Sequence, residues 1–414
     1  MLHPQIYSIQ PIIKGRNFFT SLCLLLFICC GQAQIISKSD FHTLTSADVK
    51  VGAERMEQYI DLLKGKNVAV VVNQTSLVKN TLLVDTLISL GIKITKIFAP
   101  EHGFYGTADA GANIRNGKDK SVSVSIVSLY GKHNKPTEED MKGIDIVVYD
   151  LQDVGVRFFT YVSTLHYVME ACAENNKPLI VLDRPDPNGF FVDGPVLDTA
   201  FRSFVGLDPV PIVYGMTPAE YARMLNGEKW LKGGKQCDLT CVSVQGYEHK
   251  DLYELPVKPS PNLPNMAAVY LYPSLALFEG TVISVGRGTD MAFQVMGAPE
   301  LQGAPFTFTP TSRPGATDPP YKGQVCHGYD LRDFGNVLMK NYQKLYFFWL
   351  KGAFKNYADQ SKFFNVYFKS LAGNDKLQKQ IEQGMSDEDI RKSWEPQLGN
   401  FLKIRKRYLL YTDF

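Results

Sequence analysis

The sequence predicts an α/β protein whose parallel sheet carries helices on both faces and is followed by a second domain. Between Leu62 and Leu182 the chain repeats one unit, a short β-branched strand, a polar loop and a helical stretch. This alternation is typical of parallel sheets with helical crossovers. The length of 414 residues exceeds what one ordinary core supports. The proline-rich segment 255–265 marks the passage between the two domains.

The elements follow from the spacing of the apolar residues. The expected strands are 67–72, 94–99, 122–127, 144–149, 178–182 and 238–244, with 324–330 extended in the second domain. The expected helices are 81–90, 160–174, 340–354, 362–372, 375–383 and 387–411. Another helix begins after Thr217, because Pro218 suits the first helical position and Glu220 completes a capping box.

The first 33 residues resemble a secretory signal peptide. Lys14 and Arg16 precede an apolar run over 18–30, and small residues lead to a cleavage site after Ala33. The run is short for a membrane span, and no later stretch is long and apolar enough for one. We therefore expect a protein exported across the inner membrane to the periplasm, without an integral membrane segment after signal removal. Lipid attachment through Cys29 or Cys30 is the alternative.

Composition and missing motifs exclude several classes of protein. Lys and Arg number 44 against 42 acidic residues, so there is no broad basic surface for nucleic acid. The glycine patterns of dinucleotide and nucleoside triphosphate sites are absent, and no cofactor is expected. No cysteine spacing of the metal-binding type occurs. Cys237 and Cys241 lie about 13 Å apart in an extended chain, too far to bridge each other. A bridge to Cys326 remains open.

The stretch 97–106 is the strongest candidate for a catalytic centre. An apolar strand ends at Pro100 and is followed by Glu101 and His102, with Gly103 and Gly106 allowing a tight loop. In an open parallel sheet, ligands bind beyond the carboxyl ends of the strands. Glu101 is therefore the first candidate for acid-base chemistry, although a single Glu-His after a strand is more often a loop fixture that caps a helix or pairs with a neighbour.

Four other strands are followed by polar clusters at the same end of the sheet. A shared pocket explains this concentration better than scattered surface loops do. Arg157 and Asp153 suit a structural ion pair as well as a functional role. The cluster residues are Asn73, Gln74, Tyr130, Asp150, Asp153, Arg157, Asp183 and Arg184.

The second domain adds three candidates. Asn262 lies in the proline-rich passage, and Glu279 precedes a Gly-Thr pair. Arg287 stands between two glycines, so its backbone can approach a ligand and its fork can bind a carboxylate. The same Gly-Arg-Gly pattern is also common in surface turns.

Eight motifs in order resemble the exo-β-N-acetylmuramidases of the NamZ type. They are Asn-Gln-Thr at 73–75, Pro-Glu-His-Gly at 100–103, Ser-Leu-Tyr-Gly at 128–131, Gln-Asp-Val-Gly at 152–155, Asp-Arg-Pro at 183–185, Pro-Ser-Pro-Asn-Leu-Pro at 259–264, Glu-Gly-Thr at 279–281 and Gly-Arg-Gly-Thr at 286–289. Two departures are Phe159, where tyrosine is expected, and Asp186, where asparagine is expected.

The resemblance implies a Rossmann-like catalytic domain over 36–255, an α+β domain over 256–414 and an active site in the cleft between them. It implies an exo-acting glycosidase that releases N-acetylmuramic acid from the non-reducing end of peptidoglycan fragments, such as MurNAc-GlcNAc and muropeptides. The catalytic glutamate of the family corresponds to Glu101.

Glycoside hydrolysis needs a proton donor and usually a second carboxylate. Glu101 fits the first role, with His102 and Asp153 as further catalytic candidates. The second role is open to Asp153, Glu279, Asp150, Asp183 or the substrate's own acetamido group. Arg287 or Arg157 would face the lactyl carboxylate of muramic acid, while His102, Tyr130 and Asn73 would position the substrate. The alternatives are a metal-dependent peptidoglycan amidase or peptidase, and a non-catalytic muropeptide-binding protein.

Overall fold

The computed structural model describes residues 42–109, 117–118, 124–301 and 303–414. The expected signal peptide, Cys29, Cys30 and the beginning of the strand expected at 122–127 lie outside these ranges. No helix within them is both long enough and apolar enough to cross a membrane.

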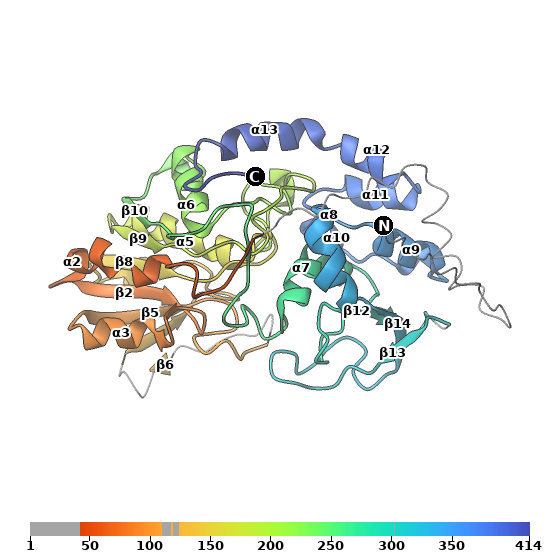
Figure 1. Ribbon diagram of the computed structural model, residues 1–414, viewed down its shortest axis with the longest axis horizontal. Helices are drawn as coiled ribbons and strands as arrows, with labels where there is room; N and C mark the ends of the chain where they lie inside the picture. The colour runs from red at the N-terminus through yellow and green to blue at the C-terminus, as the bar shows by residue number, and fades with distance from the viewer. Residues whose placement is uncertain (1–41, 110–116, 119–123, 302) are drawn as a thin grey trace, which may run out of the picture. The chain divides into compact units, whose positions relative to one another are not determined.

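A seven-stranded sheet forms the first half of the described chain, in the order β10-β9-β8-β2-β5-β7-β6 (Figure 1). The pairs from β10 to β7 are parallel, and the short β6 joins the edge antiparallel. The strand bounds are β2 Asn67–Val72, β5 Lys93–Ala99, β6 Gly117–Lys118, β7 Ser125–Ser128, β8 Ile146–Asp150, β9 Leu179–Leu182 and β10 Leu239–Val242. The expected parallel sheet is confirmed.

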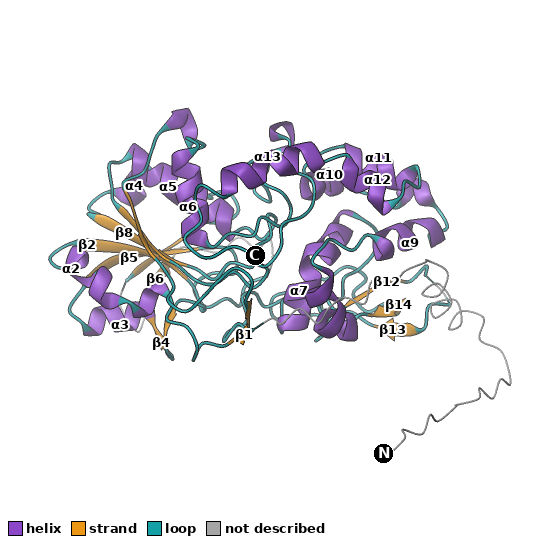
Figure 2. Ribbon diagram, turned by 45° about the horizontal axis from the view of Figure 1, so that its top comes forward, coloured by secondary structure: helices purple, strands orange, loops and turns teal. Residues whose placement is uncertain are grey.

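Both faces of this sheet are covered, which explains why the inner strands β2 and β9 are almost wholly apolar. Along β2, Val68, Val70 and Val72 pack into one hydrophobic cluster. Ala69 and Val71 pack into the other. Helices α2 (Ile60–Leu63) and α3 (Leu83–Ser89) contribute to the first cluster. Helices α4 (Glu138–Met141), α5 (Tyr161–Glu174) and α6 (Pro218–Gly227) contribute to the second (Figure 2).

The second half combines a small antiparallel sheet with helices. The sheet has the order β12-β14-β13, with bounds Val295–Ala298, Cys326–Asp330 and Phe306–Phe308. The helices are α7 Met266–Leu275, η5 Ala276–Gly280, α8 Met339–Tyr342, α9 Phe348–Asn356, α10 Tyr367–Ala372, α11 Lys376–Glu382, α12 Asp387–Lys392 and α13 Glu395–Arg405. One hydrophobic cluster runs through α5, α6, α7, α9 and α10 and so connects the two halves.

Short elements complete the described chain. They are the strand pairs β1 Thr43–Leu44 with β11 Leu252–Tyr253 and β3 Leu77–Val78 with β4 Thr81–Leu82. Further short 3₁₀ helices are η1 Gly52–Glu54, η2 Met56–Gln58, η3 Thr199–Phe201, η4 Lys232–Gly234 and η7 Gln360–Lys362, and η6 Phe334–Leu338 is a π-helix.

Several expected helices are shorter than the apolar spacing predicts. Thr81 and Leu82 form a hairpin strand, so α3 begins at Leu83. The helix expected over 340–354 divides into α8 and α9, and the one expected over 387–411 divides into α12 and α13. Pro396 lies in the first turn of α13, where a missing N–H costs nothing. The four cysteines of the described chain are free, and Cys237 neighbours Cys172 rather than Cys326.

Candidate active site

Glu101 lies in a tight turn at the carboxyl edge of the parallel sheet, directly after β5. His102, Gly103 and Gly106 adopt φ values of 69°, 77° and 65°, in the left-handed region. The amide of Gly103 donates to the carbonyl of Pro100 at 3.0 Å and closes the turn. This backbone turns the chain back at once, and the Glu101 side chain is left partly exposed.

The Glu101 carboxylate is held by the beginning of α5. The Thr160 hydroxyl, at the N-cap position of that helix, donates to Glu101 Oε2 at 2.7 Å. Tyr161 follows, and the Glu101 charge contributes, after burial, to a raised pKa of its phenol. The hydrogen bond from Thr160 thus fixes the Glu101 carboxylate between the turn that follows β5 and the loop that leads from β8 to α5.

His102 is engaged at both ring nitrogens. Nδ1 lies 2.7 Å from the carbonyl of Ala108, which can only accept, so Nδ1 donates. Nε2 therefore accepts from the Ser260 hydroxyl at 3.1 Å. Burial lowers the pKa of His102, which agrees with a neutral ring. His102 is placed to join the Glu101 turn to the proline-rich segment, and neither nitrogen is left for a substrate.

Three carboxamides make similar connections. Asn73 Nδ2 donates to the Tyr161 hydroxyl at 2.8 Å, and this hydroxyl lies 3.3 Å from the carbonyl of Pro259. Gln74 Nε2 donates to the carbonyl of Lys258 at 3.1 Å. Asn262 Nδ2 donates to the carbonyl of Gly315 at 2.9 Å. Gln74 and Asn262 bind backbone carbonyls, and Asn73 binds the Tyr161 hydroxyl that lies against another, so their placement supports positioning rather than ligand contact.

The three aspartates at the sheet edge, Asp150, Asp153 and Asp183, are buried, and their carboxylates are engaged in hydrogen bonds with other protein groups. Asp150 makes two hydrogen bonds with Arg184, at 2.6 and 2.9 Å. Asp183 accepts from the Thr217 hydroxyl at 2.7 Å and from the amide of Ala219 at 2.9 Å, and so holds the start of α6.

Asp153 accepts from the amide of Gly155 at 2.7 Å and from the Tyr214 hydroxyl. Burial raises the pKa of Asp153, and likewise that of Asp183, to about 7. The structure does not bring Asp153, Asp183 or Arg184 to an accessible surface beside Glu101.

Arg157 is also buried, and its guanidinium binds backbone alone. Nη1 donates to the carbonyls of Pro195 and Val210 at 2.9 and 2.8 Å, and Nη2 donates to that of Leu371 at 2.8 Å. Burial lowers the pKa of Arg157 to about 9. Arg157 is placed to fasten α10 to the first half of the chain, not to face a substrate carboxylate. Tyr130 is partly exposed and packs edge-on against Phe204 at 5.6 Å.

Glu279 and Arg287 form a partly exposed ion pair in the C-terminal half. Arg287 Nε lies 2.5 Å from Glu279 Oε1, and Nη2 lies 3.2 Å from Oε2. Their side chains are 24% and 18% exposed, unlike the buried aspartates. Burial opposes the charge of Arg287, but Glu279 prevails and raises its pKa. A pocket of about 160 Å³ adjoins the pair and is lined by Val282, Val285, Pro320 and Tyr321 among others.

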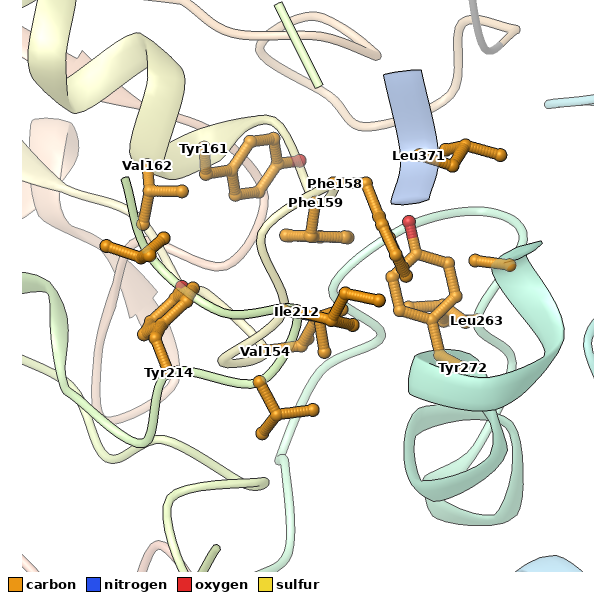
Figure 3. Close-up of a cluster of buried hydrophobic side chains, with 14 of the residues drawn as sticks. Val154, Phe158, Phe159, Tyr161, Val162, Ile212, Tyr214, Leu263, Tyr272 and Leu371 are labelled. Carbon is orange, nitrogen blue, oxygen red and sulfur yellow. The ribbon is translucent and has the colours of Figure 1, made fainter. Parts of the chain in front are cut away.

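A continuous set of aromatic contacts joins this pair to Glu101. Phe159, which precedes Thr160, contacts Tyr161 at 4.6 Å and Tyr272 at 6.0 Å between ring centroids (Figure 3). Tyr272 contacts Phe293 at 4.9 Å, and the Arg287 guanidinium lies 4.9 Å above the same ring. The charge of Glu101 in turn contributes to the raised pKa of Arg287. Glu101, Glu279 and Arg287 therefore belong to one site.

Sequence reasoning missed Thr160, which binds Glu101, and two tyrosines, Tyr272 and Tyr367, whose pKa is raised by burial and then by the charges of Glu279 and Glu101. Thr160 stands at the first position of the helix expected over 160–174, so its N-cap position was a readable signal. Tyr272 lies inside a buried helix and Tyr367 opens a short one, and neither carries a local signal.

Comparisons with known proteins cover almost the whole described chain. Residues 68–267 match the family profile described as the N-terminal region of exo-beta-N-acetylmuramidase NamZ, and residues 270–411 match its C-terminal counterpart. The chain is 37% identical over 426 residues to the peptidoglycan beta-N-acetylmuramidase NamZ of Bacillus subtilis (strain 168), covering 95% of this chain and 98% of that protein.

Two crystal structures of DUF1343 family proteins from Bacteroides fragilis NCTC 9343 are also similar. One is 43% identical with a TM-score of 0.82, covering 89% of this chain and 100% of the other. The second is 30% identical with a TM-score of 0.74, covering 88% and 99%.

Proposed function

The chain belongs to the exo-beta-N-acetylmuramidase NamZ family and is a glycoside hydrolase of that type, and we propose that it releases N-acetylmuramic acid from the non-reducing end of peptidoglycan fragments through Glu101. The observation that carries this proposal is the placement of Glu101. It is a partly exposed carboxylate at the sheet edge, it is held by Thr160, and its charge adds to that of Glu279 in raising the pKa of Arg287.

Glu101 suits the role of proton donor and acceptor. As the glycosidic bond breaks, its carboxyl group protonates the leaving oxygen, and the resulting carboxylate then takes a proton from the attacking water. The Thr160 hydroxyl holds this carboxylate in place through Oε2, and we assign the proton transfer to the Glu101 carboxyl group. Tyr161 and His102 support the surrounding loops.

Two candidates remain for the second catalytic role, the group that stabilises or attacks the anomeric centre. Asp150, Asp153 and Asp183 are occupied by buried hydrogen bonds, which argues against each of them. Glu279 and the acetamido group of the substrate remain.

Arg287 is the residue that we assign to the lactyl carboxylate of muramic acid. Its Nε and Nη2 are engaged by Glu279, whereas Nη1 has no hydrogen-bond partner in the described ranges. A guanidinium edge of this kind binds carboxylates well. The substrates that this predicts are MurNAc-GlcNAc and longer fragments ending in muramic acid.

We further propose that the protein acts in the periplasm after cleavage behind Ala33. N-terminal sequencing of the protein from a periplasmic extract tests this, and a lipid-modified Cys29 or Cys30 would instead place it on a membrane surface.

The deciding experiment measures free N-acetylmuramic acid released from MurNAc-GlcNAc. The wild-type chain is compared with Glu101→Gln and with Glu139→Gln, a change of the same chemistry at an exposed position of α4. We expect release by the wild type and the control, and a loss of about a thousandfold or more in Glu101→Gln, the scale of a general acid-base contribution. Full activity in Glu101→Gln would contradict the assignment.

Two further arms separate the alternatives. Activity that disappears with a chelator would favour the metal-dependent amidase. Among the described residues, no group of three His, Cys, Asp or Glu side chains is placed to hold a metal ion. Binding of muropeptides without any release would favour the binding protein.

A further inference from the structure

Two tyrosines of the C-terminal half have hydroxyl groups without hydrogen-bond partners among the described residues: Tyr272 on α7 and Tyr367 on α10. The Tyr272 side chain is only 7% exposed. Buried phenol hydroxyls normally have a partner, because leaving one unpaired costs free energy. The buried, unpaired hydroxyl of Tyr272 beside a candidate active site therefore points to a ligand, and the more exposed Tyr367 offers that ligand a second hydroxyl.

Packing places Tyr367 next to Glu279. The amide of Asn365 donates to the carbonyl of Gly280 at 2.9 Å, so the start of α10 lies against the end of η5. A Cβ atom at Gly280 would lie 2.4 Å from Cα of Phe368, which shows how closely the two backbones approach. Arg157 fixes the other end of α10 through the carbonyl of Leu371.

Tyr272 reaches the same place from α7, through its contact with Phe293 beneath Arg287. Electrostatics agree with this arrangement. Burial raises the pKa of both phenols, and the charge of Glu279 is the next largest cause for each, with Glu101 contributing too. Both phenols therefore stay neutral hydrogen-bond donors to a higher pH than an ordinary phenol does. Tyr367 is nevertheless 41% exposed, so its ring is open to a ligand.

Two hydroxyl donors and one carboxylate acceptor complement an amide. The amide oxygen accepts two hydrogen bonds, and the amide N–H donates one. The sugar that the proposed function places here carries one such group, the acetamido group at C2. We propose that Tyr272 and Tyr367 bind the acetamido oxygen of the resting substrate, that Glu279 accepts from the acetamido N–H, and that this oxygen is the nucleophile of the reaction. One of the two tyrosines gives up its hydrogen bond as the lone pair that it occupied attacks the anomeric carbon.

The acetamido oxygen forms a bond to the anomeric carbon while the bond to the leaving sugar breaks, and Glu101 gives its proton to the leaving oxygen. Glu279 stabilises the positive oxazolinium ring at its N–H. Water then attacks the anomeric carbon, Glu101 takes its proton, and the ring opens to restore the acetamide with retained configuration. The protein supplies no nucleophile, which agrees with the occupied state of Asp150, Asp153 and Asp183.

The inference rests on the proposed function. Its test uses aryl β-muramides whose C2 nitrogen carries an acetyl, monofluoroacetyl, difluoroacetyl or trifluoroacetyl group. Fluorine weakens the carbonyl oxygen as a nucleophile. We expect kcat/KM to fall by about a hundredfold or more across the series, because the weakened atom forms a bond in the transition state. A flat series with full turnover would overturn the inference and leave the proposed function standing.

Tyr272→Phe and Tyr367→Phe test the two donors. Each should lower kcat by about ten- to a hundredfold and change the slope of the fluorine series, which a merely structural role would not do. The matched controls are Tyr270→Phe, buried on the same helix, and Tyr329→Phe, which is exposed to a similar degree as Tyr367. Unchanged kcat in both site variants would overturn the assignment.

Binding measurements distinguish a failure of this inference from a failure of the proposed function. Calorimetry compares N-acetylmuramic acid with muramic acid, which has a free amine instead of the amide. If the wild type binds N-acetylmuramic acid but does not turn over the acetyl glycoside, the proposed function is refuted. The assignment of the two tyrosines then stands only if Tyr272→Phe and Tyr367→Phe weaken the binding of N-acetylmuramic acid. If the wild type prefers the free amine, or binds neither sugar and turns over no substrate, the inference is refuted.

Discussion

Substitution of Gly280 by alanine tests whether the contact between η5 and α10 sets the geometry of the site. The new Cβ atom would lie 2.4 Å from Phe368 Cα and 2.7 Å from its backbone nitrogen. Ordinary contact begins near 3.4 Å, so α10 must move by about 1 Å. Because the obstacle is backbone rather than a flexible side chain, no rotamer change relieves it.

This displacement has two measurable consequences. Overpacking of this kind costs about 1–3 kcal/mol of the free energy of unfolding, so the melting temperature should fall by a few degrees. The shift also separates Tyr367 from Glu279, and a misplacement of about 1 Å lowers kcat by about a hundredfold. Differential scanning calorimetry and hydrolysis of an aryl β-N-acetylmuramide measure the two effects.

Gly352→Ala is the matched control. Gly352 lies inside α9, and a Cβ atom there meets nothing within 4 Å. Alanine should stabilise that helix by about 0.5–1 kcal/mol and leave kcat unchanged. A Gly280→Ala protein with wild-type melting temperature and wild-type kcat would refute the reasoning.

Two other predictions follow from the site and from the buried aspartates. Thr160→Val removes the hydrogen bond to Glu101 and should lower kcat by about tenfold without changing the melting temperature; an unchanged kcat would show that Thr160 does not position the carboxylate. Asp153 has a folded-state pKa of about 7 against 3.8 when unfolded, so its contribution to stability is complete below pH 3.8 and is lost as the pH rises through 7. Asp153→Asn should therefore lose less stability than the wild type between pH 4 and pH 8 in urea unfolding, and parallel losses in the two proteins would contradict this.

The local patterns predicted the sheet and its edge because they depend on neighbours in sequence. The apolar strands β2, β5, β8 and β9 were expected within two residues of their observed bounds. Pro100 and the glycines that follow it predicted the turn that presents Glu101. The capping box expected at Thr217 and Glu220 is present, because both partners lie within one helical turn.

The partner of each polar side chain could not be predicted in the same way. Arg157 suggested a neighbouring carboxylate, but its guanidinium binds the carbonyl of Leu371, 214 positions away. The His102 ring suggested acid-base chemistry, yet Ser260, 158 positions away, occupies its second nitrogen. Residue type fixes how many hydrogen bonds a group can make, while the fold decides which distant groups supply them.

The sequence alone determined the α/β class, the common edge of the polar loops, the position of Glu101 and, through eight ordered motifs, the family. Only the tertiary structure decided that Glu279 and Arg287 pair, and that Arg287, Tyr272 and Tyr367 lie within electrostatic reach of Glu101, while Asp150, Asp153 and Asp183 are buried in hydrogen bonds of their own. The physical reason is that burial and contact arise when segments far apart in the chain pack together, and no local spacing of residues encodes which of them will meet.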